Sequence, residues 1–584
     1  MRFPDRRLVL TLLAIGVFLR FFGLALESFW YDELISMAGV APDTLASTMS
    51  SWVTADRHPP LHPVVLWLAV HLLGSSEAAA RLPSALASCL ALAALHAGSR
   101  RVLGSAVAFS ATAYMAFTHA SLWSAQEARP YAFLLLFSTI CTCLWLQLLE
   151  DWTPGVGPSR SRLWAYCVAS VGCCYSHYFA LPLVGVQLAY LLLVAVRTRH
   201  AILSASTLSL MIVAAFMPWL PYMAAIFVQD SSSYWMQAPG LGDLVKYANF
   251  FLFDYQVASG LAFAALVLLP VGLNAKAVCE RLAEVAGSPR GLRSPVPALI
   301  LLVLAIFLPL FAFAQFKHVM SAKNLIILAP ALYLLMAVGL EWTRSPAKSE
   351  AIWACEILAG LFFAVLAAAI VTGCARELLQ AHGTLSWHAK LVRAALLLAF
   401  TPVFLGAGRR SAALLVPCLS PAFRTMLGLG AYGPHFAFGV LALCFSLSAP
   451  DRYGIVKKEQ WREAAACAAC LYEPGDLICG LEHFEFFSDA ELAEVYLARF
   501  GVPGRSHTVR RGPEGIRRAI REALALGCRR LLFLTTVEDN WNSWEQANFK
   551  LEWAEIHRST RVAAVHSFDR TELAVLELVN TGWP

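Results

Sequence analysis

The segment that decides the fold reads L-V-L-T-L-L-A-I-G-V-F-L-R-F-F-G-L-A-L over residues 8–26 and continues E-S-F-W-Y-D-E-L over residues 27–34. The first part has 19 residues, which is enough for a helix to cross a hydrocarbon core of about 30 Å. Basic residues precede it and no small-residue cleavage site follows, so we interpret it as an uncleaved first membrane helix and not as a signal peptide. Two carboxylates, Asp32 and Glu33, come soon after this helix ends.

Composition divides the chain into two regimes. Of the 584 residues, 58% are hydrophobic and 14% are charged, with a mean hydropathy of +0.61, whereas soluble domains have about 25% charged residues. Residues 451–584 hold 37 of the 84 charged side chains. We therefore expect a membrane region up to about residue 450 and a soluble domain after it. The net charge of +6 is spread over short loops and this last domain, so we expect no nucleic-acid partner.

Apolar runs of spanning length recur along the membrane region. Runs of roughly 17–20 apolar residues are typical of membrane helices. With the first helix, they predict thirteen spans, the others lying near residues 82–98, 104–122, 130–149, 162–177, 179–196, 202–222, 256–275, 297–315, 325–341, 352–372, 391–407 and 432–449.

The apolar stretch 61–74 decides the topology, because it has only 14 residues and is preceded by prolines. Loops rich in Lys and Arg stay on the cytoplasmic side. If residues 61–74 do not span, all the following basic loops share the side of the N-terminus: 100–101, 160–162, 197–199, 276–293, 344–348 and 409–410. We therefore predict a cytoplasmic N-terminus, a long first external loop (residues 27–81) and an external C-terminal domain.

The C-terminal domain reads as α/β. Helical patterns cover residues 461–471 and 515–526, and strand-like runs cover residues 476–479, 530–535, 562–566 and 573–578. It carries no glycine-rich phosphate loop or metal signature. We expect it to cap the membrane region or to position an acceptor.

The first external loop concentrates ionisable side chains. Asp32 and Glu33 lie beside aromatic residues that suit a membrane interface, and a carboxylate there suits a general base. The segment D-R-H-P-P-L-H (residues 56–62) places His58 before two prolines, which deny it a helix. Glu77 and Arg81 follow. Loop acids are often merely solvated, which is the competing interpretation for each of these residues.

Further charges are predicted on the same external side. The segment S-A-Q-E-A-R-P-Y (residues 124–131) sets Glu127, Arg129 and Tyr131 at a membrane boundary, where a charge usually faces a partner or an aqueous cavity. Lys317, His318 and Lys323 break the positive-inside trend. External cations at a membrane surface suit a lipid phosphate or pyrophosphate. Together these groups indicate a reaction centre for a membrane-tethered phosphate ester.

Four motifs, W-Y-D-E-L-I-S, D-R-H-P-P-L-H, A-A-R-L-P-S-A-L and A-Q-E-A-R-P-Y-A, follow in this order. The chain thereby resembles the bacterial protein-mannosyltransferase-like enzymes of glycosyltransferase family 39, which are related to the lipid A aminoarabinose transferases. The resemblance is good over residues 8–225 and weakens afterwards. Relatives usually carry Arg-Tyr where this chain has Lys323 and Asn324, so the cation is kept and the aromatic ring is not.

The resemblance implies a GT-C fold: an all-α polytopic membrane domain of about thirteen helices followed by a soluble α/β domain. It divides the chain into a catalytic module (residues 1–225), a variable membrane module (226–450) and a periplasmic domain (451–584). It also implies a multi-pass protein of the bacterial inner membrane that transfers a sugar, with inversion, from a polyprenyl-phosphate donor to a glycan, lipid or protein acceptor.

The resemblance also implies roles for residues. Asp32 is the expected base, with Glu33 beside it in the catalytic pocket. Some relatives use a divalent metal ion near the donor phosphate, for which Glu77 and Glu127 are the candidates. The residues expected to bind substrate are His58, Arg81, Glu127, Arg129, Tyr131, Lys317, His318 and Lys323.

Three alternatives remain at this point. A ligase or polymerase that uses a pyrophosphate-linked donor would carry similar charges. A secondary transporter would show internal repeats and ionisable residues at mid-membrane, and neither is evident here. A non-catalytic scaffold would explain the C-terminal domain but not the acidic and His-Pro-Pro motifs.

Overall fold

The computed structural model describes most of the first 343 residues and most of the C-terminal domain. The described ranges are 6–41, 44–55, 58–152, 157–228, 238–252, 291–317, 320–343, 461–483, 487–488, 494–502, 506–536, 543–568 and 571–578. The predicted spans near 256–275, 352–372, 391–407 and 432–449, together with His318, lie outside these residues.

The chain divides into two compact units. A helical unit comprises Met1–Phe22, Arg57–His62 and Arg81–Gly454, and a mixed unit comprises Gly23–Asp56, Pro63–Ala80 and Ile455–Pro584. Most of the predicted first external loop is thus grouped with the C-terminal domain. The predicted boundary between residues 225 and 226 stays a prediction.

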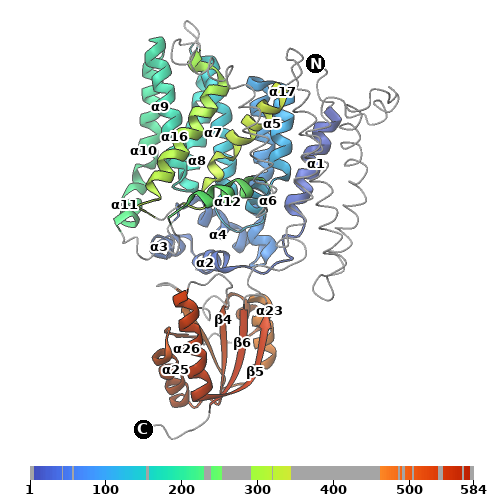
Figure 1. The fold of residues 1–584 in the computed structure, drawn as a ribbon, viewed down its shortest axis with the longest axis vertical. Coiled ribbons are helices and arrows are strands. Elements are labelled where there is room, and N and C mark those ends of the chain that lie inside the picture. Colours follow the sequence, from blue (N-terminus) through green and yellow to red (C-terminus); the bar gives the residue numbers. More distant parts are fainter. Residues whose placement is uncertain are drawn as a thin grey trace, which may run out of the picture. The chain divides into compact units, whose positions relative to one another are not determined.

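The helical unit is built from long apolar helices, most of which run side by side (Figure 1). Helices occupy the predicted spans that the structure describes, and the number of spans stays a prediction. The helices of this unit are α1 (Arg6–Phe21), α5 (Glu77–Phe117), α6 (His119–Ala125), α7 (Tyr131–Asp151), α8 (Arg160–Ser176), α9 (Ala180–Thr198), α10 (Ile202–Phe216), η1 (Met217–Trp219), α11 (Leu220–Val228), α12 (Leu241–Leu252), η4 (Gly291–Arg293), α16 (Pro295–Phe313), η5 (Asn324–Leu328) and α17 (Ala329–Thr343).

Helix α5 is a hairpin of two helical arms that turns at Gly104. Gly104 has φ 84° and ψ 166°, a conformation that essentially only glycine adopts. Residues equidistant from this turn meet: the Ser88 hydroxyl donates to the Ser121 carbonyl just beyond the second arm, and His96 lies 3.5 Å from the Thr112 hydroxyl. The two predicted spans 82–98 and 104–122 are therefore antiparallel neighbours.

Among the described residues, five helices are long and apolar enough to cross a membrane: Glu77–Phe117, Tyr131–Asp151, Ala180–Thr198, Ile202–Ala225 and Pro295–Phe313. The helix α4 (Leu61–Leu73) is apolar but has 13 residues. At a rise of about 1.5 Å per residue it is about 20 Å long, too short for a hydrocarbon core of about 30 Å. This length supports the prediction that α4 does not span.

Arg20, which sequence reasoning did not single out, holds the helical unit together near the end of α1. Its side chain is fully buried and donates to five acceptors. These are the Ser88 and Ser121 hydroxyls, both at 2.7 Å, and the carbonyls of Gly16 at 2.8 Å, Met115 at 2.9 Å and Ala116 at 3.3 Å. A guanidinium has five N–H donors, so all of them are used within the protein and α1 is tied to the α5 hairpin and α6.

The C-terminal part of the mixed unit contains a sheet of parallel and antiparallel strands. Its strand order is β2-β1-β4-β6-β5, and β3 also pairs with β1. β1 is parallel to β3 and β4, whereas β6 is antiparallel to β4 and β5. The predicted strand pair near residues 562–578 is confirmed. The elements are α23 (Trp461–Leu471), β1 (Leu477–His483), β2 (Phe487–Ser488), η8 (Ala498–Phe500), β3 (Ser506–Val509), α25 (Pro513–Ala525), β4 (Arg530–Thr536), α26 (Ser543–Ser559), β5 (Thr560–Phe568) and β6 (Thr571–Leu578).

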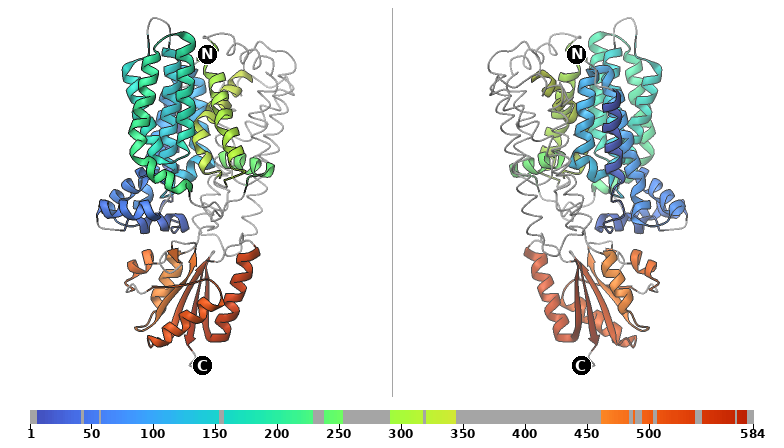
Figure 2. Two further views of the ribbon diagram at one scale, coloured as in Figure 1. Left: turned by 90° about the vertical axis from the view of Figure 1, so that its left-hand side faces the viewer. Right: turned by 90° about the vertical axis from the view of Figure 1, so that its right-hand side faces the viewer.

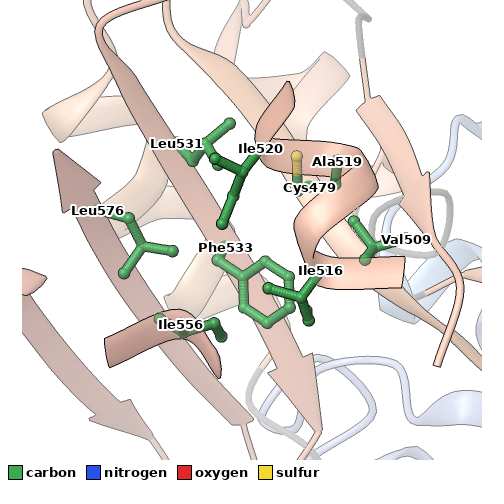
Figure 3. A pocket seen from close by; sticks show the side chains of 9 residues that line it. All are labelled: Cys479, Val509, Ile516, Ala519, Ile520, Leu531, Phe533, Ile556 and Leu576. Atoms are coloured by element: carbon green, nitrogen blue, oxygen red, sulfur yellow. The ribbon is translucent and has the colours of Figure 1, made fainter. Parts of the chain in front are cut away.

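Helices cover both faces of this sheet (Figure 2). Alternate strand residues such as Cys479, Phe533 and Leu576 form one apolar core with α25 and α26, because successive strand residues point to opposite faces. Figure 3 shows the small apolar cavity that remains in this core, lined by nine residues that include Ile516 of α25 and Ile556 of α26. Its lining is apolar apart from the thiol of Cys479, whose pKa burial raises to about 12, so that the thiol stays protonated.

The mixed unit also holds the short helices of the first loop, α2 (Tyr31–Gly39) and α3 (Leu45–Ala55). They pack closely at Gly39, where an added Cβ would lie 2.8 Å from a ring carbon of Trp52. This contact requires a residue without a side chain and fixes the far end of the helix that carries Asp32.

Candidate active site

The acidic pair lies in the first turn of α2. Asp32 is half-buried and Glu33 is fully buried. The Glu33 carboxylate accepts the N–H of Trp30, at 3.4 Å, and so caps the start of the helix. Because a helix N-terminus carries partial positive charge, it stabilises carboxylates in its first turn. The local sequence therefore presents Asp32 on a short helix whose start Glu33 stabilises.

Glu77 is the first residue of α5, and the Ser76 hydroxyl accepts the Ala79 N–H at this helix start. Its side chain is 7% exposed. One carboxylate oxygen accepts from Arg462 at 3.2 Å and from the Tyr496 hydroxyl at 3.0 Å, and the other accepts from Arg499 at 3.2 Å. Both oxygens are thus engaged by cationic or neutral donors.

This arrangement does not fit a divalent cation at Glu77, since two guanidinium groups already neutralise the carboxylate and would repel a metal ion. Among the described residues, no three His, Cys, Asp or Glu side chains lie close enough together to hold a metal ion. The metal role predicted for Glu127 stays a prediction.

In the helical unit, five side chains from distant segments form a chain of ring contacts, which we call the ring ladder. The Lys323 ammonium lies 5.2 Å from the Trp123 ring centroid, and Trp123 lies 5.1 Å from Tyr131. Tyr131 lies 5.9 Å from His177, which lies 5.0 Å from His58. The ladder brings together three predicted residues (His58, Tyr131 and Lys323) and two that were not predicted (Trp123 and His177).

The ring ladder also bears on topology. Between His58 and His177 the chain passes through α4, the two arms of α5, α7 and α8. If the predicted spans 82–98, 104–122, 130–149 and 162–177 all cross the membrane and α4 does not, the two histidines share a face, which agrees with their ring contact. The topology itself stays a prediction.

His177 is held in one orientation at the end of α8, where it is the C-terminal cap. The N–H of Phe179 donates to its Nδ1 at 3.2 Å. This geometry fixes the ring that joins His58 to Tyr131. A histidine between two apolar runs is the sequence signal that would have pointed to it.

Three more predicted residues are buried in the helical unit. Arg81 is 1% exposed, Glu127 1% and Arg129 6%. Glu127 and Arg129 belong to the turn between α6 and α7, and the Ser84 hydroxyl lies 3.5 Å from the Arg129 carbonyl. Buried ionisable groups in a membrane protein usually mark a functional site. The structure thus keeps these charges out of solvent, and their roles in binding substrate stay predictions.

Lys317 does not belong to the ring ladder. It is half-buried after the end of α16, where its N–H donates to the Phe313 carbonyl. His318 lies outside the described residues. Their predicted roles in binding a phosphate stay predictions.

The comparisons with known proteins agree with this fold. Residues 57–222 match the sequence profile of the dolichyl-phosphate-mannose-protein mannosyltransferase family. No protein of curated function matches the chain.

Among solved structures, the chain is similar to ArnT from Cupriavidus metallidurans bound to undecaprenyl phosphate, with 14% identity, a TM-score of 0.58 and 98% of each chain covered. It is also similar to the same ArnT in the apo state, with 15% identity, a TM-score of 0.56 and 97% of each chain covered. At such identities the similarity establishes the fold. Residues 57–222 therefore resemble this mannosyltransferase family, and the chain shares its fold with ArnT.

Proposed function

We propose that this chain transfers a sugar from a polyprenyl-phosphate donor to an acceptor hydroxyl, with inversion, on the periplasmic side of a bacterial inner membrane. The observation that carries the proposal is the ring ladder. It gathers a cation, Lys323, and the motif residues Tyr131 and His58 within the helical unit, and two of these three residues lie in the family match. The solved ArnT structure with undecaprenyl phosphate supports this donor class by analogy.

In the proposed reaction, the Asp32 carboxylate takes the proton of the acceptor hydroxyl. The acceptor oxygen attacks the anomeric carbon, and the bond between that carbon and the phosphate oxygen breaks. The products are the glycosylated acceptor, with inverted configuration, and polyprenyl phosphate. Lys323, Arg81 and Arg129 are proposed to stabilise the charge that develops on the leaving phosphate, which is how preorganised cations accelerate such reactions.

The test of the base is Asp32→Asn. We expect kcat to fall about a hundredfold to ten-thousandfold, the range of general-base catalysis, while the melting temperature stays unchanged. The assay follows release of polyprenyl phosphate from a labelled donor by the purified protein. Glu473→Gln, which removes a carboxylate that is 70% exposed, is the control and should keep wild-type turnover. Near-normal turnover of Asp32→Asn would remove the assignment.

The test of the donor cation is Lys323→Gln. We expect the KM for the donor to rise about tenfold, because one charge-assisted contact with the phosphate is lost. Lys246→Gln is the control, since Lys246 is 66% exposed and pairs with Asp243 at 2.7 Å. An unchanged KM in Lys323→Gln would contradict the role of Lys323.

Mass analysis of the released lipid separates this proposal from a ligase or polymerase. A polyprenyl monophosphate supports the proposed donor, whereas a diphosphate product would show that the donor is pyrophosphate-linked.

A further inference from the structure

The C-terminal domain holds the segment that leads into the acidic helix. The guanidinium of Arg462, in α23, donates to the carbonyls of Ala25 and Leu26, both at 3.2 Å. The Phe29 N–H donates to the Tyr496 hydroxyl oxygen at 2.6 Å. Three hydrogen bonds between the C-terminal domain and residues 25–29 thus hold the segment that precedes α2.

Tyr496 connects this segment to Glu77. Its hydroxyl accepts from Phe29 and donates to the Glu77 carboxylate at 3.0 Å. Tyr496 and Phe29 are fully buried, and their ring centroids lie 5.9 Å apart. The Arg499 guanidinium lies 4.8 Å from the Tyr496 ring centroid and 5.5 Å from that of Phe29. We call Glu77, Arg462, Tyr496 and Arg499 the anchor cluster.

The charges of the anchor cluster reinforce one another. Glu77 faces Arg462 and Arg499, and Arg462 also pairs with Glu463 at 2.7 Å. Burial alone would lower the pKa of Arg462, but the Glu463 and Glu77 carboxylates outweigh it and raise that pKa. Arg462 therefore remains charged, and its hydrogen bonds to the two carbonyls persist at any physiological pH.

Helix α2 needs such an anchor. It has nine residues, and isolated helices shorter than about 12 residues are marginal in water, so their stability comes from tertiary contacts. Its far end packs on Trp52 through Gly39. Its near end begins two residues after Phe29, and Asp32 follows in the first turn. The bond from Phe29 to Tyr496 thus lies two residues before the start of the helix that carries Asp32.

We propose that the C-terminal domain sets the position of Asp32 through the anchor cluster, so that Tyr496 and Glu77 are positioning residues for the transfer reaction. The inference rests on the proposed role of Asp32 as base. It assigns the domain a function beyond capping or binding an acceptor: turnover depends on contacts that the domain makes with the loop that carries the base.

The test uses Tyr496→Phe in the full-length protein, because this change keeps the ring and removes only the hydroxyl. We expect kcat to fall about tenfold to a hundredfold with little change in the donor KM, as small displacements of a catalytic group cost up to about a hundredfold. Hydrogen exchange of residues 29–34 should accelerate, since the Phe29 N–H loses its acceptor. Tyr472→Phe, at a half-buried tyrosine of the same domain, is the control and should change neither quantity.

The second variant in this test is Glu77→Gln. If the two residues act through one connection, the double variant Glu77→Gln/Tyr496→Phe should lose about as much kcat as the stronger single variant, well short of the product of the two losses. Independent, multiplicative losses would overturn the proposal. So would a fall in kcat of Tyr496→Phe without faster exchange in residues 29–34, or faster exchange with unchanged kcat.

The two proposals fail in different ways. Normal turnover of Asp32→Asn would overturn the base assignment, and with it the catalytic consequence of the anchor, whatever the exchange data show. Loss of turnover in Asp32→Asn combined with wild-type behaviour of Tyr496→Phe would leave the base in place and overturn only the anchor.

Discussion

Arg20 and Glu77 are both buried ionisable side chains, but their partners differ. Arg20, in the helical unit, donates to five neutral oxygens, three of which are main-chain carbonyls. Glu77, in the mixed unit, accepts from two arginines and a phenol. The partners of Arg20 lie in the protein interior, whereas the two arginines that pair with Glu77 are 31% and 24% exposed and retain contact with water. The comparison teaches that buried charges in this chain are held either by neutral acceptors shielded from water or by opposite charges at the edge of solvent.

The largest effect is expected at Arg20. In Arg20→Met, two hydroxyls and the carbonyls beyond α1 lose a buried donor, and each buried acceptor that is left unsatisfied costs about 1–3 kcal/mol. We expect a lower yield and a much lower melting temperature in detergent. Arg6→Met, at an exposed position of the same helix, should melt like the wild type. A stable Arg20→Met protein would show that the five hydrogen bonds are not what holds α1.

A smaller effect is expected at Glu77, because its arginines can turn to water. Glu77→Gln should destabilise the mixed unit by about 1–3 kcal/mol, the cost of a buried group that loses charged partners. The loss of stability is measured by thermal melting of the wild type and the variant at low and high salt. The matched control is Glu473→Gln, since Glu473 is 70% exposed and pairs with Arg530 at 3.2 Å. Equal losses in the two variants would remove the distinction between buried and exposed pairs.

The smallest effect is expected at Glu522 of α25, whose carboxylate is 40% exposed. Hydrogen bonds from His507 and Arg518 lower the pKa of Glu522 below its ordinary value of 4.5. Its stabilisation is therefore present above about pH 4.5 and is lost as the pH falls through the lowered value. Solvent screening keeps it small.

Melting of the wild type and Glu522→Gln from pH 7 to pH 3 tests this sign. The difference in melting temperature between the two proteins should be present near pH 7 and vanish toward pH 3. A difference that grows toward low pH would contradict the predicted sign.

The sequence predicted most of the described fold because its main signal is local. Apolar runs of spanning length and the alternation of the C-terminal strands both depend on neighbouring residues. α26 and β3 were missed for a physical reason. α26 buries Glu552 and Glu555, which bond to the Gly512 N–H and to Arg517, so its inward face does not read as apolar. β3 has four residues.

The candidate site was predicted less completely because its contacts are long-range. Charged residues in motifs, such as Asp32, Arg129 and Lys323, stand out against an apolar chain. Trp123 and His177 do not, since an aromatic ring near a helix end is ordinary in a membrane protein. The contact between Glu77 and Tyr496 joins residues 419 positions apart. The local sequence around either residue does not predict a contact with the other.

The shortness of α4 limits how this chain can evolve. With 13 residues it falls short of the roughly 17–25 needed to span, so a few added apolar residues would let it insert across the bilayer. Under the predicted topology, every downstream segment would then change compartment, and the basic loops would have to be translocated. Insertions in α4 should therefore be strongly selected against, while insertions of equal length in surface loops of the C-terminal domain should be tolerated.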